Sequence, residues 1–312
     1  KVGSEVSVGQ SIGMKDETAA RYFATHNLTL SLMISLVWAS ILFFFSVPIV
    51  DFYELKSHIA DNAVNYLRIV STAFPFVFMS AAATGIFNAS GRSKIPFTIN
   101  GIGLAINMIL DPLFIFVFNW ETDGAALATW IAQSCVFSLF IYQLKFKQIL
   151  WNDFCFFGKL KKIYTSKILR IGLPVAILNS LFAFVNMFLG RTASTVGGHI
   201  GLMAMTTSGQ IEAITWNTSQ GFSTALSAFV AQNYAAQKIS RVLKALKSTL
   251  LMTLIFGTIC SLLFIFCGNQ IFAIFVPERE AYEAGGLALR IDGYSQLFMM
   301  LELILQGVFY GM

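Results

Sequence analysis

Charged side chains are scarce in this sequence: they make up 12% of its 312 residues, whereas hydrophobic residues make up 56%. Soluble globular domains carry about 25% charged residues. A chain with so little charge cannot cover a soluble surface, and its mean hydropathy is +0.70. The composition therefore indicates an integral membrane protein.

Cysteine and histidine are also too few and too scattered to form a site. The four cysteines have no metal-ligand spacing, and the three histidines form no cluster. No glycine-rich phosphate loop follows a strand, and no helix carries the clustered acids and histidines of a catalytic centre. We therefore predict no metal site, no cofactor and no catalytic residue. Membrane topology explains the net charge of +5 better than a nucleic-acid partner does.

The sequence contains several long apolar segments. A membrane-spanning helix needs about 20 mostly apolar residues, and the runs here are too long for the strands of a membrane barrel. The sequence therefore predicts an all-α membrane helix bundle with about eight complete spanning helices. Their expected ranges are 27–50, 64–89, 96–118, 125–145, 169–190, 201–232, 245–275 and 287–311.

Basic residues are unevenly divided between the two sets of loops. Sixteen of the 21 Lys and Arg residues lie in or beside the N-terminal segment and the loops 90–95, 146–168 and 233–244. Because cytoplasmic loops carry the excess of Lys and Arg, we expect these loops to be cytoplasmic. The segment 146–168 also mixes aromatic side chains with lysines, which predicts an amphipathic segment on the membrane surface. An ordinary long loop is the alternative.

An internal repeat relates the two parts of the chain. With a shift of 222 residues, LRI at 67–69 falls on LRI at 289–291, and GIF at 85–87 falls on GVF at 307–309. Transporters are often built from such repeated halves. The register predicts six helices per lobe and a native chain that adds about one and a half helices before this sequence and two after it. The lobes and the linker between them are then 1–145, 146–168 and 169–312.

An acid in the middle of an apolar run is the most informative single position. Asp111 lies in NMILDPLFIF at 107–116, four residues after Asn107, so the two side chains share one face of a helix. A charge at mid-bilayer costs about 2.5–3.5 kcal/mol on insertion scales, and such residues commonly mark an ion path. The alternative is a structural pair that ends or bends the helix before Pro112.

Two further acids lie in apolar surroundings in the second half. Glu302 lies deep in MMLELILQG, and Glu212 lies in GQIEAI beside Gln210. We expect both at a second-lobe cavity, in contact with an ion or a cationic substrate. For Glu212 the alternative is a network that packs helices together.

Several motifs give nearly the whole chain a resemblance to the multidrug and toxic compound extrusion (MATE) transporters. The larger superfamily also contains flippases for lipid-linked oligosaccharides and polysaccharides. The motifs are YLRI at 66–69, GIFNASGRSKIP at 85–96, NMILDPLFIF at 107–116, DGAALATWIAQ at 123–133, RIGLP at 170–174, GQIEAI at 209–214, TALSAFVAQNYAAQ at 224–237 and LQGVFYGM at 305–312.

The resemblance implies a twelve-helix protein of the plasma or inner membrane, with two pseudo-repeated lobes and alternating access. It implies a monomeric antiporter that exports drug-like or cationic small molecules, driven by influx of protons or sodium. In related transporters an Asn-xxx-Asp pair like Asn107 and Asp111 forms a cation site with a threonine and a tyrosine. Thr129 and Tyr66 stand at the matching positions.

The chain departs from some branches of this family in its second half. Those branches place an acid on the helix that follows the linker, soon after its proline. Here the same helix carries only Asn179 and Asn186 as candidates for the second-lobe cavity.

Two other functions compete with drug export. A flippase for a lipid-linked oligosaccharide or polysaccharide precursor would be expected to carry more cationic residues in its cavity, whereas the intramembrane charges here are acidic. A membrane-embedded enzyme of lipid metabolism would need a cluster of catalytic residues that the sequence lacks. We therefore predict a transporter that is not an enzyme and whose surroundings are the lipid bilayer.

The predicted orientation can be tested by labelling single cysteines from outside the cell. A cysteine that replaces Glu280 should react with a membrane-impermeant maleimide, because the loop around it is predicted to be external. A cysteine that replaces Lys161 should react only after the cells are opened. The reverse pattern would overturn the orientation.

Overall fold

The computed structural model describes residues 1–51, 57–147, 150–151 and 154–312. The chain forms two compact units, unit 1 (Lys1–Arg170) and unit 2 (Ile171–Met312). Throughout the described ranges the regular structure is helical and contains no strand, which confirms the predicted all-α class.

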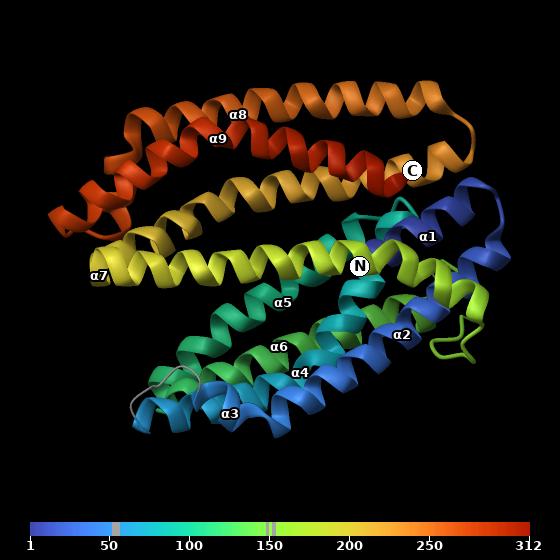
Figure 1. The fold of residues 1–312 in the computed structure, drawn as a ribbon. Helices are drawn as coiled ribbons and strands as arrows, with labels where there is room; N and C mark the ends of the chain where they lie inside the picture. Colours follow the sequence, from blue (N-terminus) through green and yellow to red (C-terminus); the bar gives the residue numbers. More distant parts are fainter. Residues whose placement is uncertain (52–56, 148–149, 152–153) are drawn as a thin grey trace. The chain divides into compact units, whose positions relative to one another are not determined.

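Unit 1 is a bundle of helices packed around α4. Figure 1 shows α2, α4, α5 and α6 side by side, and α1 packs against both α2 and α4. The helix bounds are α1 (Val2–Gly13), α2 (Glu17–Phe44), α3 (Ser46–Asp51), α4 (Ser57–Ala89), α5 (Lys94–Pro112), the π-helix η1 (Leu113–Val117), α6 (Glu121–Ile141) and the π-helix η2 (Tyr142–Phe146).

The first predicted span, 27–50, differs from the structure at both ends. α2 begins ten residues earlier, because the side chain of Asp16 caps it by accepting a hydrogen bond from the backbone N–H of Ala19 at 2.8 Å. The helix ends at Phe44, and Ser46 starts the short α3. Polar residues in the first turns of α2 hid this start from a search for apolar runs.

The linker is attached to α2 through its backbone. Thr25 donates its hydroxyl hydrogen to the carbonyl of Cys155 at 2.7 Å, and Nε2 of His26 accepts from the N–H of Lys161 at 2.9 Å. Trp151 and Phe154 are buried in the core of unit 1, where their rings stack at 5.6 Å. A position of the segment 146–168 on the membrane surface stays a prediction, as do the boundaries of the lobes.

Unit 2 consists of most of α7 (Lys162–Ala235) together with α8 (Ile239–Phe275) and α9 (Arg279–Gly311). α7 is kinked at Gly198, whose φ of 57° is a conformation that glycine adopts without a steric penalty. The kink falls between the two helices predicted at 169–190 and 201–232. Beyond it, α7 packs with α8 and α9 around Leu226, Val230, Val242, Ile304 and Val308.

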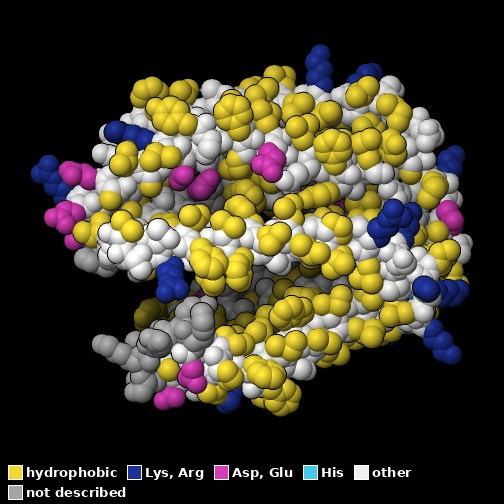
Figure 2. Space-filling view, in the orientation of Figure 1, with side chains coloured by type: hydrophobic (Ala, Val, Ile, Leu, Met, Phe, Trp, Pro, Cys, Tyr) yellow, Lys and Arg dark blue, Asp and Glu magenta, His cyan; other side chains and the backbone are white. Residues whose placement is uncertain are grey.

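Six helices are long and apolar enough to cross a membrane among the residues that the structure describes. They cover six of the eight predicted spans; α9 and the part of α7 after the kink are helical but are not among them. Large apolar side chains such as Trp38, Met108 and Phe266 are exposed on these helices. Figure 2 shows hydrophobic side chains over much of the visible face, as expected for helices that contact lipid.

The internal repeat is visible as the same close helix contact in both units. A Cβ atom added to Gly85 of α4 would lie 2.7 Å from the carbonyl oxygen of Lys1. A Cβ atom added to Gly307 of α9 would lie 2.5 Å from the carbonyl oxygen of Ser223. These two pairs are related by the shift of 222 residues that the sequence predicted. Both units therefore use a glycine to bring two helix backbones together.

Replacement of Gly307 by alanine should destabilise the protein by about 1–3 kcal/mol, because the methyl group meets backbone atoms that cannot move aside. Gly221 of α7 has no atom within 4 Å of its added Cβ, so Gly221→Ala should be neutral or slightly stabilising. Thermal unfolding of the two purified variants measures the difference. Equal melting temperatures would show that the contact is not tight.

Candidate ion and substrate sites

Asp111 and Asn107 form a local pair on α5. The amide nitrogen Nδ2 of Asn107 donates to Oδ1 of Asp111 at 3.1 Å, and both side chains are half-buried. Among the described residues the one salt bridge joins Arg279 and Glu283 in unit 2, so no basic side chain neutralises Asp111 there. The carboxylate therefore keeps oxygen atoms that can accept a proton or a cation.

The pair lies immediately before a distortion of the helix. Pro112 has no backbone N–H and cannot make the usual helical hydrogen bond. The π-helix η1 follows, closed by the N–H of Phe118, which donates to the carbonyl of Leu113 at 3.1 Å. Single π-turns are frequent at functional sites. Asp111 thus lies at a point where its helix departs from regular geometry.

Thr129 and Tyr66 lie on the helices beside α5. Thr129 is half-buried on α6, which packs along α5, and Tyr66 is 39% exposed on α4. In the described part of the chain no hydrogen bond joins either residue to Asp111. The nearby Arg68 is occupied elsewhere, because its Nε donates to the hydroxyl of Ser46 at 2.9 Å. The structure therefore pairs Asp111 with Asn107 directly and places the other two on adjacent helices.

A second polar network crosses from α7 to α9 in unit 2. Nε2 of Gln296 donates to Oε1 of Glu212 at 2.7 Å, and the hydroxyl of Thr215 donates to Oε1 of Gln296 at 2.7 Å. Gln296 and Thr215 are buried, and Glu212 is half-buried. One amide thus satisfies a carboxylate and a hydroxyl on the neighbouring helix. This geometry matches the packing network that was the alternative reading of Glu212, and it leaves one carboxylate oxygen for another ligand.

Asp292 is a candidate residue that the sequence reasoning missed. It lies four residues before Gln296 on α9, half-buried, and near enough to Glu212 for the two carboxyl groups to interact electrostatically. Glu302, the acid predicted from the sequence, lies ten residues further along the same helix. Asp292 has the signal that identified Asp111, an acid four residues from an amide, so the same criterion would have found it.

Glu302, Asn179 and Asn186 are not part of this network. Glu302 is exposed on α9 and accepts a hydrogen bond from Gln306 of its own helix at 2.9 Å. Asn179 and Asn186 are exposed on α7, and the amide of Asn186 donates to the carbonyl of Phe182 at 3.1 Å. The predicted second-lobe residues are therefore spread over different faces, and their roles stay predictions.

The comparisons with known proteins point to one family. The MatE family model matches residues 1–113 and 174–312. The probable multidrug resistance protein YoeA of Bacillus subtilis is 27% identical over 310 residues, which cover 95% of this chain and 65% of YoeA. The probable multidrug resistance protein NorM of Thermotoga maritima is 22% identical over 99% of this chain and 67% of its own. The chain thus spans about two thirds of the length of these relatives.

Solved structures show the same fold. A mutant of the MATE transporter VcmN of Vibrio cholerae superposes with a TM-score of 0.88 at 16% identity, over 99% of this chain and 71% of that one. The TM-score supports the shared helical architecture, and an identity of 16% assigns no substrate.

The network around Gln296 should contribute measurably to stability. Replacement of Gln296 by leucine removes both of its side-chain hydrogen bonds and leaves the carboxylate of Glu212 without its amide donor, while the hydroxyl of Thr215 can still donate to the carbonyl of Glu212 at 2.7 Å. The expected loss is about 2–4 kcal/mol, seen as a lower melting temperature of the purified protein. Ser295→Ala is the matched control, because Ser295 is exposed and bonds only to a carbonyl of its own helix. Equal losses in the two variants would contradict the network.

Proposed function

The chain belongs to the MatE family, and on that premise we propose that it acts as a secondary exporter of drug-like cations driven by proton or sodium influx. It is a multi-pass membrane protein of a transporter family. The multidrug resistance names of YoeA and NorM support export rather than lipid flipping. The observation that carries the proposal is the half-buried carboxylate of Asp111, which is bonded to Asn107 and lacks a basic partner among the described residues.

Asp111 has the chemistry to take up a coupling ion. In the observed pair the amide of Asn107 donates its N–H, so the amide oxygen stays free to join the carboxylate oxygens around a cation. Hard cations prefer such oxygen ligands. Thr129 and Tyr66, on the adjacent helices, can add hydroxyl oxygens after small side-chain movements. A proton on Asp111 would cancel the same charge, so one site serves either ion.

A change of charge at Asp111 alters the packing of unit 1 through the distorted end of α5. Pro112 and η1 weaken the regular hydrogen bonding of α5 just after the acid. Loading of the ion then alters how this end of the helix packs on α6. An ion shifts a conformational equilibrium only by its difference in affinity for the two states. Asp111 supplies that difference if its oxygens contact the ion in one state and not in the other. Action as a monomer stays a prediction.

Asp111→Asn should abolish coupling while leaving the fold intact. Asparagine removes the charge and keeps nearly the same volume, so the protein should insert and melt normally. Gradient-driven export of ethidium should fall by about tenfold or more, within the usual range of coupling between two sites. The measurement uses everted membrane vesicles from cells that express the protein from its native gene, at several values of pH and sodium concentration.

Asp61→Asn is the matched control, because Asp61 is an exposed acid of the same unit. It should export at the wild-type rate. Export by Asp111→Asn at the wild-type rate under all these conditions would make Asp111 a structural residue. Coupling would then have to run through Glu212 or Glu302 in unit 2.

A further inference from the structure

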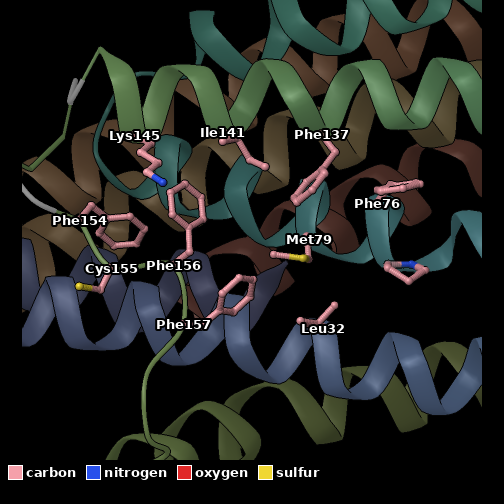
Figure 3. Close-up of a pocket in the computed structure, with 11 residues that line it drawn as sticks. Leu32, Phe76, Met79, Phe137, Ile141, Lys145, Phe154, Cys155, Phe156 and Phe157 are labelled. Carbon is pink, nitrogen blue, oxygen red and sulfur yellow. The ribbon is translucent and has the colours of Figure 1, made fainter.

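Unit 1 contains a cavity of about 690 Å³ that the proposed export function does not use. It lies between α2, α4, α6 and the linker, as Figure 3 shows. Its volume falls within the range of about 300–1,000 Å³ that is usual for small-molecule sites. Phe76 and Met79 of α4 and Phe137 of α6 form much of its apolar wall.

Lys145 is the one charged residue among the described residues that line the cavity. Phe137, Ile141 and Lys145 follow one another at intervals of four, so they share one face of α6 and its continuation η2. Figure 3 shows the ammonium group of Lys145 beside the ring of Phe156. No described acid pairs with Lys145. The cavity is therefore apolar along its walls and positively charged at one point.

The linker forms the remaining wall, and α2 holds it in place. Phe154, Phe156 and Phe157 line the cavity together with Cys155. Thr25 fixes the carbonyl of Cys155, and the hydroxyl of Thr29 accepts from the N–H of Gly158 at 3.4 Å. The aromatic wall is thus attached to a helix by hydrogen bonds and does not depend on lipid contacts for its position.

This charge pattern selects against the substrates proposed for export. A cationic drug would be repelled by Lys145 and would find no acid to pair with among the described lining residues. The charged end of the cavity also lies apart from Thr129, one of the candidate ion-site residues. Lys145 lies sixteen residues after Thr129 along α6, which corresponds to about 24 Å. A ligand of this cavity therefore differs from the exported compound in both chemistry and location.

We propose that this cavity binds an anionic amphiphile, with its acyl chain among the aromatic side chains and its headgroup at Lys145. Lysine acts as a point charge that suits a carboxylate or a phosphate. Lys145 lies on the side predicted to be cytoplasmic, where membranes carry anionic lipids. A free fatty acid and an anionic phospholipid share the required chemistry. The bound amphiphile would contact α4, α6 and the linker at once.

Cys155 provides a reporter at the edge of the cavity, because it is exposed and is among the lining residues. The test uses the protein expressed from its native gene, purified in uncharged detergent, with Cys135, Cys260 and Cys267 replaced by alanine. The alkylation rate of Cys155 by a polar maleimide is measured with oleate, dioleoylphosphatidylglycerol, oleyl alcohol or oleylamine. We expect one or both of the anionic compounds to slow alkylation by about two- to fivefold, the factor typical of one partly exposed ion pair.

Lys145→Gln should remove this protection, and Lys147→Gln is its matched control. Lys147 is two residues away and exposed, and its ammonium group lies over the ring of Tyr142, 5.6 Å from the centroid, outside the cavity lining. The Lys147→Gln variant should leave the protection of Cys155 intact. A fatty acid with a photoreactive diazirine should also attach to peptides that contain Phe137 or Phe156 in the wild-type protein and not in Lys145→Gln.

The outcomes of this test distinguish a fatty acid from a phospholipid, and they include results that would contradict the proposal. Protection by oleate alone indicates a fatty acid, and protection by phosphatidylglycerol alone indicates a phospholipid. Equal protection by oleyl alcohol, stronger protection by oleylamine, no protection at all, or unchanged protection in Lys145→Gln would each overturn the proposal. The assay needs no ion gradient, so Asp111→Asn should keep the protection even though it loses export, and failure of one proposal leaves the other standing.

Discussion

A helix inside a lipid bilayer must satisfy its own polar groups, because the hydrocarbon core offers no water to do so. This constraint explains why the described regular structure is helical and why many of its polar side chains bond to a carbonyl of their own helix. Ser138 donates to the carbonyl of Ser134, and Thr258 donates to that of Leu254, each within its own helix. In the same way, the carboxylate of Asp111 accepts a hydrogen bond from Asn107 of its own helix. This pair differs in one respect: an amide neutralises no charge, and no described basic side chain forms a salt bridge with Asp111.

The linker is the main described stretch whose backbone is not helical. Its described residues between Phe154 and Leu160 are not helical, so their backbone groups need other partners. α2 supplies them from its first half, through Thr25, His26 and Thr29. Nδ1 of His26 bonds to the carbonyl of Tyr22 at 2.7 Å, which leaves Nε2 as the acceptor for the linker. This attachment also holds the aromatic residues of the linker that line the cavity beside Lys145.

Local spacing was readable from the sequence, and long-range pairing was not. The pair on α5 follows from two residues four positions apart, so the predicted contact between Asn107 and Asp111 is present. Gln296 lies four residues after Asp292, so the same spacing is present there, but this spacing does not predict the hydrogen bond from Gln296 to Glu212. Its partner Glu212 is 84 residues away, and only the packing of α7 on α9 brings the two together. The attachment of the linker to α2 depends in the same way on contacts that no sequence interval encodes.

The repeat is clearest in the contacts that pack the helices together. The close contacts at Gly85 and Gly307 are equivalent in the two units, since each lets two helix backbones approach.

The candidate acids of α9 do not follow that equivalence. A shift of 222 residues carries Asp292 onto Val70, Gln296 onto Phe74 and Glu302 onto Ser80, none of which is ionisable. The close helix contacts need only a glycine at the point of contact, so a duplicated packing scheme persists while individual polar positions change. A buried acid destabilises a membrane helix unless it is used or compensated. Asp292 and Glu302 therefore mark positions where the two halves differ in chemistry.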